Sequence, residues 1–408
     1  MYNSTRPAGH TPTLIASFLH FDVCFMLWVL LGALGVFVAE SAGLNAAQKG
    51  LMVAIPVLSG SLLRLPLGLL SDRVGGRRVG VTLLIFLLAP LLMGWRLAFG
   101  NSTVYLLGAM LGVAGASFAV VLPLASRWYP AERQGLVMGI AAAGNSGTVI
   151  ANLLAPRLAV HVGWQNVFGL ALVPLTAVLV TFAVMARDSP AGGGARPMAT
   201  YIAVLHEVDT WWFCLLYAVT FGGYVGLSSF LPIFLRDHYH VTPVNAGLLT
   251  ALAAFVGSGV RPIGGYLADR VGGVALLRWL LVAIAATYAA ASTLPPLAIM
   301  VGILVVGMAC LGSGNGAVFQ LVPQRFRCEI GMATGIVGAV GGVGGFLLPT
   351  LLGEMKQRAG SFGPGFLVLA LIAAAALIAL HRLAVGRAGL WWRVTPLSPA
   401  VATVEELQ

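Results

Sequence analysis

The stretch SGSLLRLPLGLLSDRVGGRR at residues 59–78 returns in altered form as GSGVRPIGGYLADRVGG at residues 257–273. Aligning the two copies places Arg64 over Arg261 and the DRVGG string over an identical string, at a constant shift of 197 residues. This shift is about half of the 408-residue chain. The repeat predicts two similar halves, each with an arginine in apolar sequence and a charged, glycine-containing turn after it.

Composition indicates a membrane protein. Hydrophobic residues make up 59% of the chain and charged residues 9%, and the mean hydropathy is +0.94, so spanning segments must fill most of it. The net charge of +10 does not indicate a nucleic-acid partner, because the charges fall in short loops between apolar runs. The four cysteines form no C-x-x-C pair, so we expect neither a disulfide framework nor a metal site.

We predict an all-α integral membrane protein with twelve transmembrane helices in two pseudo-symmetric six-helix bundles. The spans are expected at about 14–38, 46–70, 79–99, 103–126, 136–157, 164–186, 210–235, 245–268, 274–294, 297–322, 332–353 and 363–385. The first run is too long for a signal-peptide core. The predicted parts are an amino-terminal bundle (1–190), a cytoplasmic interdomain loop (191–209), a carboxy-terminal bundle (210–385) and a cytoplasmic tail (386–408).

The distribution of Lys and Arg predicts the orientation. Loops on the amino-terminal side hold fifteen of these residues and loops on the other side hold six. The positive-inside rule therefore predicts that both termini and the central loop are cytoplasmic, in a protein of the cytoplasmic (inner) membrane. Two of the 23 cations remain inside spans, and they are the repeated pair Arg64 and Arg261.

A buried arginine pair needs a reason, because an arginine deep in a span costs about 2.5–3.5 kcal/mol on insertion scales. The alternative is a purely structural role, in which each arginine forms a salt bridge to a buried carboxylate, but Asp22 is the only acid within a predicted span. Two guanidiniums about 8 Å apart repel by roughly 2 kcal/mol at an effective dielectric of 20. An anion between them reverses the sign, and the planar fork of arginine suits a small planar oxyanion or a carboxylate.

Glycine-rich segments also follow the 197-residue shift, with Gly144 and Gly147 aligned to Gly341 and Gly344. On spacing alone, helix packing is the favoured interpretation. Asn145 adds an amide donor to the first segment. In the seventh predicted span, Tyr217 and Phe221 lie one turn apart on one helix face, a pattern more typical of a core than of a site.

These features together resemble a known family. Twelve spans in two halves, with GLLSDRVGGRR after the second and GYLADRVGG after the eighth, look like the major facilitator superfamily. AAAGNSG and GAVGGVGGFLLP resemble the two nitrate signatures of its nitrate/nitrite porter family, and RWYP, TFGGYVG and FDVCFMLWVLLGALGVF are also similar. The resemblance covers nearly the whole chain.

The resemblance implies residue roles. For substrate binding these are the clamping arginines Arg64 and Arg261, the hydroxyl of Tyr217, the signature Asn145, and aromatic residues at Phe221, Phe118 and Phe25. The signature glycines are Gly144, Gly147, Gly341, Gly342, Gly344 and Gly345, and the cytoplasmic gate is Asp72, Arg73, Asp269 and Arg270. One departure is Thr148, which stands where the first signature often continues with glycine, and another is the missing Arg-Arg after the second loop copy.

The expected function is transport of nitrate, nitrite or both by a monomer, with the anion held at the midplane during alternating access. Exchange of one anion for another ranks first, because the empty arginine pair repels. Proton symport is the alternative, with Asp22 as the candidate coupling residue and His20 near it. A small-carboxylate carrier ranks below both. We expect no catalytic set, metal or cofactor, since no converging carboxylate pair or Ser/His/Asp set is present.

Overall fold

The computed structural model describes residues 9–96, 101–130, 133, 137, 140–190, 204–326 and 330–386. All regular elements in these ranges are helices. In chain order they are α1 (Thr11–Ala33), α2 (Gly35–Ala42), α3 (Ala46–Val74), α4 (Gly76–Arg96), α5 (Asn101–Gly112), η1 (Val113–Ser117), α6 (Phe118–Ser126), η2 (Ala143–Ser146), α8 (Gly147–Val162), α9 (Trp164–Met185), α11 (Val208–Tyr239), α12 (Pro243–Gly259), α13 (Arg261–Val271), α14 (Gly273–Ser292), α15 (Leu297–Arg325), α16 (Ile330–Ala359) and α17 (Gly363–Gly386).

The predicted all-α membrane fold is confirmed. Within the described ranges, eleven helical segments are long and apolar enough to span a bilayer, and their bounds lie within a few residues of eleven predicted spans. The remaining predicted span, 136–157, corresponds to η2 and α8, and most of its residues before 140 lie outside the described ranges. The predicted first span is interrupted at Leu34, where α1 ends and α2 begins. The interdomain loop lies largely outside the described residues, and the tail almost entirely.

The repeated DRVGG strings form the same local structure in both halves. The first glycine of each string ends a helix with a positive backbone angle, φ 99° at Gly75 and φ 88° at Gly272. A side chain is strained in this conformation, whereas glycine adopts it readily. The next helix begins at the second glycine, Gly76 or Gly273. The string therefore works as a helix stop and restart, as the repeat predicted.

The two copies differ at the arginine. Arg64 lies inside the continuous helix α3, whereas Arg261 is the first residue of α13, after a break at Val260. Pro262 follows Arg261 in the first turn of α13, a position where a proline costs no helical hydrogen bond. The break therefore places Arg261 at a helix start, and it leaves this side chain partly exposed while Arg64 is buried.

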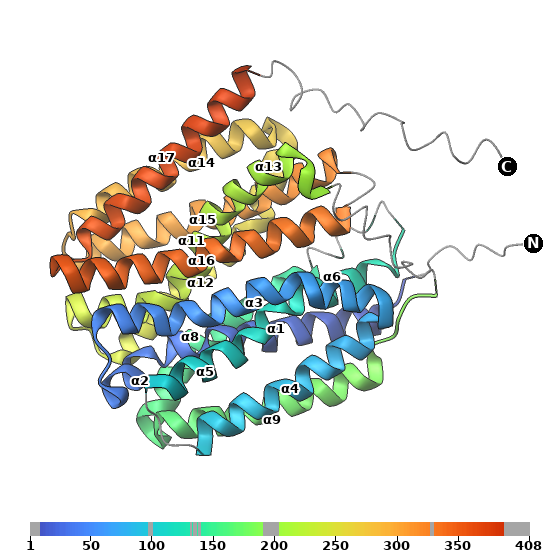
Figure 1. Ribbon diagram of the computed structural model, residues 1–408, viewed down its shortest axis with the longest axis horizontal. Helices are drawn as coiled ribbons and strands as arrows, with labels where there is room; N and C mark the ends of the chain where they lie inside the picture. The colour runs from blue at the N-terminus through green and yellow to red at the C-terminus, as the bar shows by residue number, and fades with distance from the viewer. Residues whose placement is uncertain are drawn as a thin grey trace, which may run out of the picture.

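The helices of the first half, coloured blue to green, group below those of the second half, coloured lime green to red (Figure 1). The groups meet mainly where α3 packs against α16, α1 against α11, and α8 against α12, and α11 also contacts α3 and α2. Glycines allow close backbone approach at these contacts. A Cβ at Gly50 would meet Pro349 and Gly353, and a Cβ at Gly32 would meet the backbone of Ser229. The interface between the halves is therefore tightly packed.

Polar bonds join the halves at one end of the molecule. The Lys49 ammonium of α3 forms an ion pair with the Asp237 carboxylate of α11 at 2.8 Å. The backbone N–H of Ala46 donates to the side-chain oxygen of Gln357 at 3.2 Å. We call this the Lys49 end, and these bonds hold it closed.

The opposite end, which we call the Asp72 end, carries a different kind of ion pair. Arg127 pairs with Asp72 inside the first half, and Arg325 pairs with Asp209 inside the second half at 2.5 Å. These pairs stabilise each half separately and do not tie the halves together. The two ends of the molecule are therefore not equivalent.

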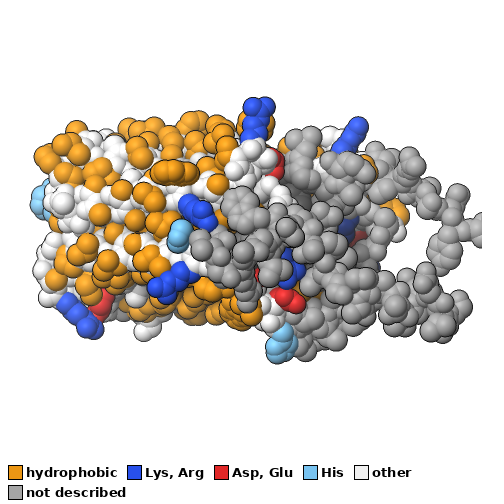
Figure 2. All heavy atoms as spheres, turned by 90° about the horizontal axis from the view of Figure 1, so that it is seen from above, with side chains coloured by type: hydrophobic (Ala, Val, Ile, Leu, Met, Phe, Trp, Pro, Cys, Tyr) orange, Lys and Arg blue, Asp and Glu red, His pale blue; other side chains and the backbone are white. Residues whose placement is uncertain are grey.

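The outer surface is suited to lipid. Figure 2 shows a face on which hydrophobic side chains cover most of the left-hand part and charged side chains are few. Large apolar side chains on α9, α14 and α17 are exposed, among them Val173, Trp279 and Leu371. Apolar exposure over so many helices indicates contact with hydrocarbon.

The glycine packing is testable on α16. A Cβ at Gly344 would meet the backbone of Ala218 on α11, which cannot move aside cheaply, whereas a Cβ at Gly335 would meet nothing within 4 Å. We expect Gly344→Ala to destabilise the protein by about 1–3 kcal/mol. Gly335→Ala is the control and should leave stability unchanged or slightly raised. Thermal unfolding in detergent measures both, and equal midpoints would contradict the packing argument.

Candidate functional site

Arg64 is a buried cation at the boundary between the halves. Its side chain is 1% exposed, its Nε donates to the carbonyl of Gly115 at 3.1 Å, and its Nη1 donates to the carbonyl of Gly338 on α16. Its Nη2 has no hydrogen-bond partner among the described residues, and no described carboxylate forms an ion pair with it. The buried Arg64 guanidinium therefore keeps one N–H group, Nη2, without a hydrogen-bond acceptor among the described residues.

Three aromatic rings surround this guanidinium. Its carbon lies 5.0 Å from the ring centre of Phe221, 5.3 Å from Phe118 and 5.4 Å from Trp28. Trp28 and Phe118 belong to the first half and Phe221 to the second. Ring faces attract a cation, which offsets part of the cost of burying it. The described neighbours of this guanidinium are rings and carbonyl groups, and none of the ion pairs among the described residues involves it. Its charge is therefore available to a ligand.

The second cation of the repeat faces the same cluster. Tyr217 of α11 is 1% exposed, and its hydroxyl lies close enough to the side chains of Arg261 and Arg64 to interact with both charges. The two guanidiniums also interact with each other electrostatically. The structure therefore brings Arg64, Arg261, Tyr217, Phe221 and Phe118 close together.

Phe319 of α15 belongs to this cluster and was missed by the sequence analysis. Its ring centre lies 4.8 Å from Tyr217, 5.9 Å from Phe118 and 5.6 Å from the Arg261 guanidinium carbon. Trp28, which contacts Arg64, was missed as well. Both residues lie in long apolar runs, where one aromatic residue is not distinguishable from the core. We call Arg64, Arg261, Tyr217 and these rings (Trp28, Phe118, Phe221, Phe319) the arginine cluster.

Phe25 and Asn145 are less directly placed. Phe25 contacts Trp28 at 5.0 Å between ring centres, and Trp28 in turn contacts Arg64. Asn145 is in the short 3₁₀ segment η2, is 3% exposed, and its side-chain oxygen has no partner in the described part of the chain. The structure shows no hydrogen bond from Asn145 to either arginine. Its buried, unpaired amide oxygen still marks it as a polar group available to a ligand.

The signature glycines lie at helix contacts. Cβ atoms at Gly144 and Gly147 would meet the backbone of α1 around Asp22. On α16, a Cβ at Gly341 would meet Tyr217, and one at Gly344 would meet the backbone of Ala218, both in the second half. A Cβ at Gly342 would meet Ser61, and one at Gly345 would meet Val57, both in the first half. The structure thus supports the packing interpretation, and it explains how α16 can touch α3 and α11 at once.

The candidate coupling residue lies beside the first signature. Asp22 of α1 accepts a hydrogen bond from the Ser146 hydroxyl at 2.6 Å, next to Asn145. His20 is fully buried, and its Nε2 bonds to the carbonyl of Gly80 at 3.2 Å. Asp22 therefore links α1 to the start of α8, whereas His20 is held inside the first half.

The predicted gate residues lie at the Asp72 end. Asp72 pairs with Arg127 and is partly buried, whereas Arg73, Asp269 and Arg270 are exposed. Arg270 lies over the ring of Tyr266 at 4.6 Å. No group of three or more His, Cys, Asp or Glu side chains suited to a metal ion occurs among the residues described.

Comparison with known proteins places these features in a family. A model of the major facilitator superfamily matches residues 16–349. The nitrite extrusion protein of Bacillus subtilis is 36% identical over 358 residues, which cover 87% of this chain and 89% of that protein. The probable nitrate/nitrite antiporter NarK1 of Thermus thermophilus is 32% identical, over 90% of this chain and 89% of that one.

Solved structures share the fold. A crystal structure of the nucleoside transporter NupG superposes with a TM-score of 0.72 at 12% identity, over 91% of this chain and 99% of that one. A bacterial homologue of the human lysosomal transporter Spinster, in an inward-facing and occupied conformation, gives a TM-score of 0.66 at 20% identity, over 95% of this chain and 98% of that one. At these identities the likeness concerns the fold alone.

The Tyr217 hydroxyl can be tested apart from its ring. We expect Tyr217→Phe to weaken anion binding about ten- to hundredfold, because a hydrogen bond involving a charged group is worth about 1.5–3 kcal/mol. The stacked contact with Phe221 and the edge-on contact with Phe319 are retained, so stability should change little. Tyr288→Phe is the control, since its buried hydroxyl has no partner among the described residues. Calorimetric titration with nitrate is the measurement, and equal affinities in both variants would contradict this role for Tyr217.

Proposed function

The chain belongs to the major facilitator superfamily and, within it, to the nitrate/nitrite porters, and on this premise we propose that it carries nitrate and nitrite across the cytoplasmic membrane by alternating access. The observation that carries the proposal is the buried Arg64, with one free donor edge inside a box of aromatic rings. A small planar oxyanion matches that free edge. The functions named for two relatives agree with it.

We assign the two arginines to opposite sides of one anion. Arg64 comes from the first half, and Arg261 with Tyr217 comes from the second, so an anion between them is held by both halves. The rings of Phe221, Phe118 and Phe319 cover the flat faces of such an anion. Phe25 packs against the Trp28 ring, and we assign the amide NH2 group of Asn145 to a further contact with the anion.

Exchange of nitrate for nitrite follows from the charge balance. Without an anion, two cations remain in a buried cluster that contains no carboxylate, and they repel each other. The halves must rearrange around this cluster to change access, and a bound anion removes the repulsion. The loaded carrier therefore switches more easily than the empty one, which favours exchange over net flux.

Proton symport is the second candidate, and Asp22 is the observation that favours it. Its carboxylate bonds to Ser146, one residue from Asn145, so a proton on Asp22 would alter the segment that carries the signature asparagine. A small-carboxylate carrier is a third possibility, because formate and acetate also fit a guanidinium fork.

We further propose that the Asp72 end faces the cytoplasm and that both termini lie on that side, as the distribution of Lys and Arg predicts. On this assignment Asp72, Arg73, Asp269 and Arg270 close the inner side in the opposite conformation, when the Lys49 end opens. The working unit is a monomer of two six-helix bundles, because the arginine cluster draws on both halves of a single chain.

Replacing arginine by lysine tests the clamp. Arg64→Lys and Arg261→Lys keep the charge and lose the planar fork, so we expect each to reduce nitrate uptake by about a hundredfold or more. Arg96→Lys is the control, because Arg96 lies at the end of α4, over the neighbouring Trp95 ring. Uptake is measured in proteoliposomes with matched protein content. Normal nitrate affinity in both lysine variants would contradict the proposal that the two arginines hold the anion.

Counterflow separates exchange from symport. Proteoliposomes loaded with nitrite and given labelled nitrate outside should take up label, whereas empty vesicles under an inward proton gradient should not. Uptake by the empty vesicles would indicate symport and contradict exchange, and Asp22→Asn should then abolish this proton-driven uptake. Inhibition of uptake by excess formate or acetate would instead indicate a carboxylate carrier.

A further inference from the structure

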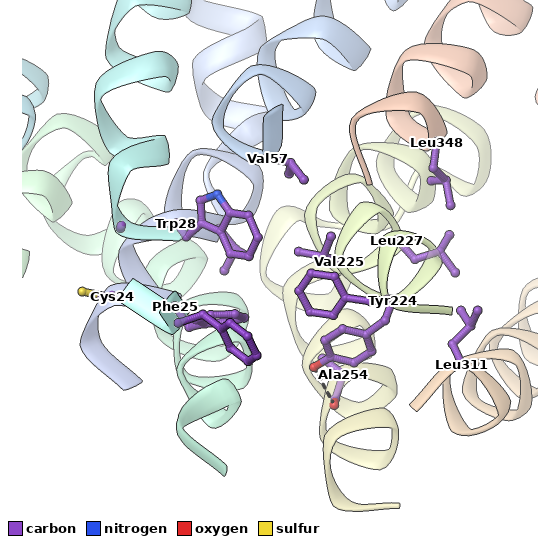
Figure 3. Close-up of a cluster of buried hydrophobic side chains, with 14 of the residues drawn as sticks. Cys24, Phe25, Trp28, Val57, Tyr224, Val225, Leu227, Ala254, Leu311 and Leu348 are labelled. Carbon is purple, nitrogen blue, oxygen red and sulfur yellow. Dashed lines mark hydrogen bonds between the residues drawn. The ribbon is translucent and has the colours of Figure 1, made fainter. Parts of the chain in front are cut away.

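A chain of hydroxyl groups crosses between the halves next to the arginine cluster. Tyr224 of α11 is fully buried, and its hydroxyl lies 3.1 Å from the Thr148 hydroxyl of α8 and 2.6 Å from the Ser258 hydroxyl of α12. Thr148 also donates to the carbonyl of Asn145 at 2.8 Å. Figure 3 shows Tyr224 with its hydroxyl directed at the backbone of Ala254, a 3.3 Å contact on the same helix as Ser258.

The protons of this chain have a consistent arrangement. Thr148 gives its proton to the Asn145 carbonyl, so it accepts from Tyr224. The single Tyr224 proton lies between two acceptors, the Thr148 oxygen at 3.1 Å and the Ala254 carbonyl at 3.3 Å, and Tyr224 accepts from Ser258. The contacts therefore run from Ser258, three residues before Arg261, to Asn145 in the other half. The chain connects the turn that carries one predicted substrate residue with the segment that carries another.

The bond between Thr148 and Tyr224 lies between the arginine cluster and the Lys49 end. Tyr224 is seven residues, about 10 Å of helix, beyond Tyr217 toward the Lys49 end. In that direction Asn152 of α8 donates to the carbonyl of Ser228 on α11 at 3.3 Å, a second bond between the halves. The Thr148–Tyr224 bond is thus the polar link nearest the arginine cluster on the closed side.

We propose that Thr148 and Tyr224 are positioning residues that act as a releasable latch between the halves, holding the Asn145 segment and the Arg261 turn together while the Lys49 end is closed. The proposal rests on alternating access as proposed above. When the Lys49 end opens, this bond must break, because α8 and α11 belong to different halves. Thr148 then keeps the Asn145 carbonyl and Tyr224 keeps Ser258, so neither hydroxyl is left buried without a partner.

This release explains why a threonine is suitable at a position where the family signature often has glycine. Thr148 is 0% exposed, so it fills the contact between α8 and α11, and its hydroxyl adds one hydrogen bond to the closed state. A single such bond is weak enough to be broken in every cycle. Glycine at this position would offer the close approach without the bond.

Distances between spin labels on the two halves test the latch. Labels are placed at Ser41→Cys and Ala359→Cys, which are exposed at the Lys49 end, in a background without the four native cysteines. We expect Thr148→Val and Tyr224→Phe each to raise the ratio of separated to closed molecules about fivefold, as expected for the loss of one hydrogen bond. The double variant should shift no further than either single variant, because both remove the same bond.

Two controls keep the test decisive. Thr148→Ser retains the hydroxyl and should restore the original distribution. Thr250→Val removes a buried hydroxyl on α12 that bonds only to Ala246 within its own helix, and it should leave the distribution unchanged. Unchanged distances in Thr148→Val and Tyr224→Phe would overturn the latch. A double variant whose fold-change in the ratio of separated to closed molecules equals the product of the two single fold-changes would also overturn it.

The same variants distinguish failure of the latch from failure of the proposed function. If the unmodified protein carried no nitrate in proteoliposomes, the substrate assignment would be wrong, but the label distances would still decide whether the hydroxyls couple the halves. If nitrate uptake were normal and the distances did not respond, the latch alone would be overturned.

Discussion

A guanidinium buried between two halves of a membrane protein is the constraint on which this structure depends. Arg64 is fully enclosed, and its partners are two carbonyls and three ring faces in place of a carboxylate. One of those carbonyls, Gly338, comes from the other half. The cation therefore contributes to holding the halves together, and it retains the charge and the donor edge that an anion needs.

The glycines make this arrangement possible. Helix α16 must bring the Gly338 carbonyl to Arg64 while packing against both α3 and α11, and a side chain at Gly341 or Gly342 would overlap Tyr217 or Ser61. Small residues at such contacts let membrane helices approach closely. The packing and binding interpretations of the signature segments are thus not alternatives, because close packing is what places the backbone acceptor at the cation.

The repeated residues were predictable from the sequence, and the residues that complete the site were not. The 197-residue shift identified Arg64 and Arg261, since a charge in an apolar span stands out, and the DRVGG turns formed as expected at Gly75 and Gly272. Phe319 and Trp28 carry no such signal, because aromatic residues are common in apolar helices. The break before Arg261 was not predictable from Pro262, because Pro66 in the first copy lies inside a continuous helix. The pairing of Thr148 with Tyr224 required the position of one half against the other.

The energies of these contacts fit a carrier that must change conformation repeatedly. A strong ion pair between the halves at the centre would be costly to break in low dielectric, since the separated charges would remain buried. The chain uses a cation against rings and carbonyls there, and it places the Lys49–Asp237 ion pair at the end, where both side chains are about one-fifth exposed. Water can then replace either partner as the end opens. The arrangement leaves the central charge unpaired and places the breakable bonds at the closing surface, which is what the proposed alternating access by two rigid halves needs.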